Sequence, residues 1–99
     1  MPSLDTKQIQ RRLKLLPEWS RRGRAIRRRF SFAGFMGSVE FVNRIARQAE
    51  RANHHPDIDI RWNRVTLALT THDKGGLTGK DFAMARKCDE AFSRLAKAR

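Results

Sequence analysis

The sequence predicts an α+β fold, in which helices pack on one face of a four-stranded antiparallel sheet to form two layers. Apolar residues recur at helical spacing in three segments, and they alternate with polar residues in four others. The order along the chain is helix, two strands, helix, two strands, helix. Because each of these elements must bury its apolar side, two layers around one core satisfy all of them. We therefore expect a single domain over residues 1–99.

The first predicted element is a short N-terminal helix. Asp5 or Thr6 can cap its start, and Pro17 stops it. Its predicted apolar face consists of Ile9, Leu13 and Leu16.

A hairpin follows, with strands over residues 19–22 and 24–32 and a turn at Gly23. Ile26, Phe30 and Phe32 alternate with polar residues and are expected to face the core. Arg28 breaks this alternation. We therefore expect the second strand to bulge or to run along an edge of the sheet.

From residue 35 to about residue 53 the apolar period becomes helical. Gly34 is an acceptable N-cap for this helix. The stripe expected to face the core consists of Phe35, Val39, Val42, Ile45, Ala46, Ala49 and Ala52.

A second hairpin is predicted from residues 57–62 and 65–71, with a two-residue turn at Asn63 and Arg64. For both apolar sets to face one core, the pairing must keep them on the same side of the sheet. The expected register pairs Trp62 with Val65, Ile60 with Leu67 and Ile58 with Leu69.

The last helix is predicted to begin at a variant of the capping box formed by Thr78 and Asp81. The single cysteine, Cys88, lies in the apolar stripe of this helix and is expected to be a small core residue. One cysteine excludes an intramolecular disulfide and fits a reducing compartment. The full stripe consists of Phe82, Ala85, Cys88, Phe92 and Leu95.

All three histidines lie in the segment from residue 50 to residue 81. Glu50 and His54 are four residues apart near a helix end, so the carboxylate can orient that imidazole. His55 precedes Pro56, which turns the chain out of the helix. If the predicted pairing of the second hairpin is extended beyond its strands, His55 lies opposite His72. The three imidazoles can therefore converge.

Each of these residues also has a structural interpretation. A pair of histidines at a helix end is more often structural than catalytic. Asp81 can be no more than the capping carboxylate of the last helix. Glu50 can pair with a neighbouring arginine, and Trp62 can be a core residue. A metal site is not favoured, because adjacent histidines lack the usual ligand spacing.

The segment resembles the signature of the pterin-4a-carbinolamine dehydratase family. The residues that carry the resemblance, with their spacing, are Glu50, His54, His55, Pro56, Trp62, His72 and Asp81. The chain length and the order of its segments are also similar to that family. The fold that the resemblance implies is a β2-α-β2-α unit with an added N-terminal helix, in agreement with the pattern of elements.

The activity implied by this resemblance is loss of water from 4a-hydroxytetrahydropterin to give quinonoid dihydropterin, in tetrahydrobiopterin recycling. The implied roles are acid–base catalysis by His54 and His72, orientation by Glu50, and contact with the pterin by His55. Which of His54 and His72 is the acid stays open. Trp62 and Asp81 are expected at the substrate pocket, and no metal or organic cofactor is expected. The resemblance also implies a homodimer or homotetramer.

The chain is strongly basic, with a net charge of +12 and six arginines between Arg21 and Arg29. Such a field attracts nucleic acid, anionic lipid or acidic proteins. The ordinary interpretation is a solvated strand face, and nucleic acid is not favoured because no recognised binding motif is present. The alternative to the enzyme is therefore a non-catalytic binding or assembly factor with the same fold. Its basic surface would hold an acidic protein or nucleic acid.

The sequence contains no apolar run near the length that a membrane span needs, and no basic-then-apolar leader. We expect a cytoplasmic protein without a membrane partner.

Overall fold

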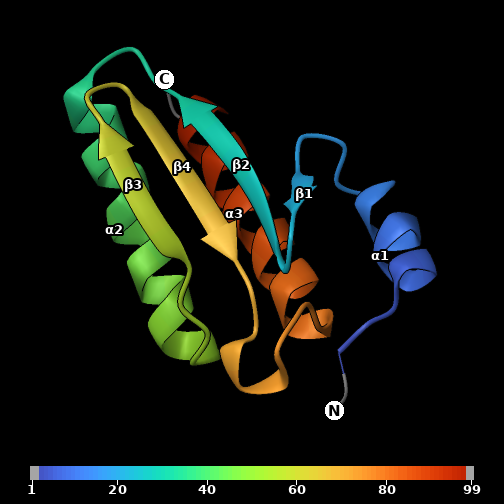
Figure 1. The fold of residues 1–99 in the computed structure, drawn as a ribbon. Helices are drawn as coiled ribbons and strands as arrows, with labels where there is room; N and C mark the ends of the chain where they lie inside the picture. The colour runs from blue at the N-terminus through green and yellow to red at the C-terminus, as the bar shows by residue number, and fades with distance from the viewer. Residues whose placement is uncertain (1–2, 98–99) are drawn as a thin grey trace.

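The computed structural model describes residues 3–97, and it confirms the α+β fold (Figure 1). A four-stranded antiparallel sheet has the strand order β1-β2-β4-β3. The elements are α1 (Thr6–Leu13), β1 (Ser20–Arg22), β2 (Ala25–Ser31), α2 (Phe35–Ala52), β3 (Asp57–Arg61), β4 (Arg64–Leu69), the short 3-10 helix η1 (His72–Lys74) and α3 (Gly79–Lys97).

Helices α2 and α3 lie side by side on one face of the sheet, and the other face is open (Figure 1). The core lies between the layers. Phe30, Phe41 and Phe92 form its aromatic centre, with ring centroids 4.6 Å apart for Phe30 and Phe41 and 5.2 Å apart for Phe30 and Phe92. Among the described residues, no helix is both long and apolar enough to cross a membrane.

Helix α1 begins as predicted, with Asp5 as its N-cap. The Gln8 backbone N–H donates to Asp5 Oδ1 at 2.8 Å, and the Asp5 N–H donates to Gln8 Oε1 at 2.9 Å, which completes a capping box. The helix ends at Leu13, before Pro17, so Leu16 reaches the core from the connection rather than from the helix.

The core face of α2 is rotated relative to the predicted stripe. Ile45 and Ala49 are buried as expected, but Phe41 is also fully buried, and Phe35 is 51% exposed. Ala46 and Ala52 are exposed as well. The predicted stripe left out Phe41, whereas the structure packs the Phe41 ring against Phe30 and Phe32, where it buries a large apolar surface.

The expected bulge in β2 does not form, because β2 pairs residue by residue with β4 and Arg28 occupies a regular position opposite Leu67. The expected edge is found in part: β1 pairs with residues 25–27 of β2, and from Arg28 onward no described strand pairs with β2 on that side. The Arg28 side chain lies on the helix-covered face and bonds to Asp89 of α3 at 2.7 Å. A partner on the facing helix therefore allows an arginine to occupy an inward position without a bulge.

The hairpin of β3 and β4 forms, but its turn lies one residue earlier than predicted. Trp62 and Asn63 form the turn, and Trp62 adopts φ 52°, so Ile60 pairs with Val65 and Ile58 with Leu67. The apolar sets still share one face, because the shift in register is two residues. Continued past the ladder, this register places Thr70 rather than His72 opposite His55, so the predicted facing of these two histidines is wrong.

Helix α2 ends where the sequence predicts. Asn53 adopts a left-handed conformation with φ 51°, and its N–H donates to the Ala49 and Glu50 carbonyls. The His54 N–H also donates to the Ala49 carbonyl, at 3.1 Å. This C-cap turns the chain, so His54 and His55 leave the helix in a fixed direction.

Candidate functional site

The candidate site begins with a buried carboxylate at the start of α3. Asp81 is 0% exposed, and its Oδ1 lies 2.6 Å from Nε2 of His54. Its Oδ2 accepts hydrogen bonds from the Thr71 hydroxyl at 2.8 Å and from the Thr78 backbone N–H at 2.9 Å. The bond from Thr78 confirms the predicted cap. One side chain therefore joins the end of α2, the residue before η1 and the start of α3.

This network orients the imidazole of His54. The His54 side chain is 11% exposed, and its Nε2 faces the Asp81 carboxylate, which stabilises a proton on that nitrogen. The second ring nitrogen, Nδ1, is then left as the acceptor. Because the capping bond and the histidine bond use different oxygens of Asp81, capping and orienting the imidazole are compatible roles.

The predicted bond between Glu50 and His54 is wrong, because Glu50 pairs with the next histidine. Glu50 Oε2 lies 2.6 Å from Nε2 of His55, and both side chains are well exposed. The left-handed residue Asn53 ends the helix before His54, so the helical spacing of four no longer applies there. His54 is held by Asp81 instead, and His55 by Glu50.

His72 opens η1 and is exposed. It lines a hollow of 260 Å³ together with Arg24, Ala25, Thr70, Gly75 and Gly76. This volume lies slightly below the range of about 300–1,000 Å³ that is typical of drug-sized ligands. Gly75 adopts φ +68°, a conformation that side chains rarely take. His54 and His55 do not line this hollow.

The predicted site residues therefore divide into two groups. Glu50, His54, His55 and Asp81 lie around the end of α2 and the start of α3, and Asp81 connects His54 to Thr71, which directly precedes His72. Trp62 lies in the turn at the other end of β3 and is 68% exposed (Figure 1). It is not a core residue, and it lies at the opposite end of the hairpin from the histidines.

The sequence alone does not reveal Arg24 and Thr71 as neighbours of the site. The Thr70 hydroxyl donates to the Arg24 carbonyl, which brings the first hairpin next to His72. This proximity depends on β2 pairing with β4, and sequence periodicity does not reveal strand order. Thr71, a threonine at a strand end, carried no signal of its own.

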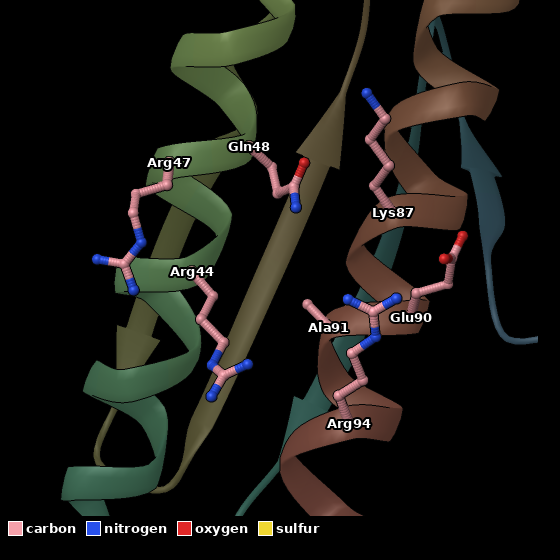
Figure 2. Close-up of a pocket in the computed structure, with 7 residues that line it drawn as sticks. All are labelled: Arg44, Arg47, Gln48, Lys87, Glu90, Ala91 and Arg94. Atoms are coloured by element: carbon pink, nitrogen blue, oxygen red, sulfur yellow. The ribbon is translucent and has the colours of Figure 1, made fainter.

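Two other features bear on what the site can bind. Within the described residues, no group of three or more His, Cys, Asp or Glu side chains is arranged to hold a metal ion. A hollow of 580 Å³ forms a groove between α2 and α3, and its walls are mainly Arg44, Arg47, Lys87 and Arg94 (Figure 2). None of the histidines lines this groove.

Residues 2–91 match the model of the family described as pterin 4 alpha carbinolamine dehydratase. The chain belongs to this family. A relative from Chloroflexus aurantiacus, provisionally named pterin-4-alpha-carbinolamine dehydratase, is 53% identical over 90 residues, which cover 91% of this chain and 97% of the relative. A relative from Thermomicrobium roseum with the same provisional name is 50% identical over 93 residues, covering 94% of this chain and all of the relative.

Solved structures agree with the fold. A protein from Brucella melitensis, described as a transcriptional coactivator/pterin dehydratase, superposes with a TM-score of 0.87 at 33% identity. The match covers 90% of this chain and 97% of that protein. A pterin dehydratase-like protein, described as a RuBisCO assembly factor in the alpha-carboxysome, superposes with a TM-score of 0.66 over 76% of this chain and 89% of its own. At 22% identity, the second likeness bears on the fold alone.

Proposed function

We propose that this member of the pterin 4 alpha carbinolamine dehydratase family is a hydro-lyase that removes water from 4a-hydroxytetrahydropterin. The product would be quinonoid dihydropterin, and the physiological setting would be tetrahydrobiopterin recycling. The observation that carries the proposal is the family match over residues 2–91, together with intact histidines at the positions that the family resemblance names.

The proposed reaction needs a proton donor and a proton acceptor near neutral pH. Hydroxide leaves C4a only when its oxygen is protonated, while a ring nitrogen of the pterin loses a proton. Histidine is the side chain whose ordinary pKa suits both transfers. His54 and His72 are the proposed pair: the Asp81 carboxylate orients His54 and also accepts a hydrogen bond from Thr71, the residue before His72, and His72 lines a hollow.

The remaining site residues support this pair in different ways. Glu50 orients His55, which is exposed enough to contact a bound heterocycle. Asp81 is fully buried and both of its oxygens are occupied, so in this proposal it positions His54 rather than touching the substrate. We give Trp62 no role in the pocket of its own chain.

The test is a dehydratase assay on His72→Ala. We expect a loss of about 10²- to 10⁴-fold in kcat, the usual contribution of one general acid or base. Lys74→Ala is the matched control, because Lys74 is an exposed residue of the same short helix and does not line the hollow. Unchanged turnover in His72→Ala, with the wild-type protein active, would remove His72 from the mechanism. Absence of dehydratase activity in the wild-type protein would refute the proposal as a whole.

We further propose that the chain forms a homo-oligomer through the β3 edge of the sheet. Within residues 3–97, no strand pairs with the outer side of β3, and its inward-facing residues Ile58 and Ile60 remain 38% and 40% exposed. Phe35, Met36 and Trp62 add exposed apolar surface, and the Ser38 hydroxyl, which donates to the Trp62 carbonyl, ties the turn to α2. An exposed edge strand with apolar side chains is suited to pairing with a second copy.

Light scattering on Ile60→Lys tests this second proposal. We expect the mass to fall to that of the 11.5 kDa monomer. Leu15→Lys is the control, because Leu15 is 75% exposed in the connection between α1 and β1. A wild-type protein that is itself monomeric would contradict the proposal.

A further inference from the structure

The open face of the sheet carries a cluster of arginines, which we call the arginine face. It consists of Arg22, Arg27, Arg29, Arg61 and Arg64, which occupy outward positions on all four strands. Two adjoining hollows of 310 Å³ and 300 Å³ lie on it, and both are lined by Arg27, Arg29 and Thr66.

Like charges are placed close together on this face. Arg61 and Arg64 are direct cross-strand partners, and such pairs reduce the stability of a sheet. Arg27 and Arg29 are two residues apart on β2, which separates them by about 7 Å. Of these arginines only Arg61 forms an ion pair among the described residues, with Asp59 at 3.5 Å, and Asp59 also lines the 310 Å³ hollow. Asp57 shares the β3 edge and Glu18 lines one hollow, so the positive charge concentrates on β2 and β4.

The uncharged residues of the arginine face indicate what kind of partner suits it. The outward strand positions between the charges are all small or hydroxyl-bearing: Ser20, Ala25, Ser31, Thr66 and Ala68. Protein interfaces draw most of their energy from a few buried aromatic, aliphatic or arginine anchors packed in apolar surroundings. This face offers charge without such an anchor, so it is better suited to a polyanionic backbone than to an acidic protein.

We propose that the arginine face binds the phosphate backbone of duplex nucleic acid without regard to sequence. Guanidinium groups form paired hydrogen bonds with phosphate oxygens, and counterion release supplies the free energy. No outward strand position carries an aromatic ring on which an unpaired base could stack, so contacts would be to phosphates. The sequence does not favour nucleic acid, because no recognised binding motif is present. The strand pairing adds that these arginines share one open surface.

The groove between α2 and α3 is the competing basic surface (Figure 2). Arg44, Arg47, Lys87 and Arg94 line it, and Glu90 adds one carboxylate. Its cations lie along two helix walls, which suits a compact anion. The open face is about 19 Å wide across four strands, and β2 alone is about 23 Å long, so an extended polyanion can contact several arginines at once.

The experiment measures how salt affects the affinity for a labelled DNA duplex of arbitrary sequence. The logarithm of the binding constant falls with the logarithm of salt concentration, with a slope near −0.9 per phosphate contacted. We expect the double variant Arg27→Ser/Arg29→Ser to reduce the steepness of this slope by about 1.8, the equivalent of two contacts. Arg44→Ser/Arg47→Ser removes the same charge from the groove and is expected to leave the slope unchanged.

Three results would overturn the proposal. An equal reduction in both variants would mean that net charge alone causes binding, without a site. A reduction only in Arg44→Ser/Arg47→Ser would place the site in the groove. Tighter binding of a poly-glutamate peptide than of the duplex at the same ionic strength would identify an acidic polypeptide as the partner. Dehydratase activity is expected to be normal in both variants, so this test is independent of the catalytic proposal.

Discussion

Strand β2 presents three consecutive arginines to two different environments. Arg28 points to the helix-covered face, where its guanidinium lies 4.2 Å from the centroid of Phe30 and 2.7 Å from Asp89. Arg27 and Arg29 point to the open face, where within the described residues neither has an ion-pair partner. The difference shows that the side of the pleat, and not the residue type, decides whether an arginine stabilises the fold or remains available to a ligand.

The largest effect is expected from removing the partner of the inward arginine. Asp89 Oδ1 accepts hydrogen bonds from Arg28 at 2.7 Å and from the indole N–H of Trp19 at 2.9 Å. Asp89→Ala leaves both donors without this acceptor, so we expect unfolding in urea to show a loss of about 2–4 kcal/mol. Glu90→Ala is the control, because Glu90 is the exposed neighbour on α3, and its loss should change stability by less than about 0.5 kcal/mol. Equal effects of the two substitutions would show that Arg28 does not depend on Asp89.

A second effect arises from the thiol on the same covered face. Burial, the largest cause, and nearby Asp89 together raise the pKa of Cys88 from 9.0 to about 12, against the opposing effect of Arg28. The unfolded chain ionises first, so this contribution to stability is complete below about pH 9 and is lost as pH rises toward 12. We expect the wild-type protein to lose stability above about pH 9 more steeply than Cys88→Ala, as measured by urea unfolding at several pH values. The chain contains no tyrosine, so no phenol titrates in this range in either protein. Parallel pH profiles would contradict the expectation.

The smallest effect is expected on the open face. Arg27→Ser and Arg29→Ser remove exposed side chains that have no ion-pair partner in the described part of the chain, so each should change the free energy of unfolding by less than about 0.5 kcal/mol. A loss as large as that of Asp89→Ala would mean that both faces contribute equally to stability, and the contrast between them would disappear.

The fold could be predicted from the sequence because it depends on local patterns. The three helices, four strands and the end of α2 near Asn53 all follow from periodicity and capping. Errors arose where a choice depended on distant partners. Arg28 breaks the apolar alternation of its strand, and its partner Asp89 lies 61 residues away in the sequence. Trp62 continues the apolar alternation of a strand, and its left-handed turn contains no glycine that would reveal it.

The candidate site was predicted in its composition but not in its contacts. The seven spaced residues identified the family and the right region of the chain. The bonds within it were assigned by spacing along an ideal helix, which stops applying once Asn53 breaks the helix. The bond from Asp81 to His54 spans 27 residues, and only the packing of α3 beside α2 reveals it.

The buried carboxylate of Asp81 has a consequence for how this end of the molecule moves. Its hydrogen bonds hold three chain segments that are distant in sequence, so none can detach without breaking a bond to a group that is 0% exposed. Fraying of the first turn of α3 would therefore release the imidazole of His54 at the same moment. The three segments bonded to Asp81 should open and close as one cooperative unit. Amide protons near His54, Thr71 and Thr78 should then exchange with solvent at a common rate.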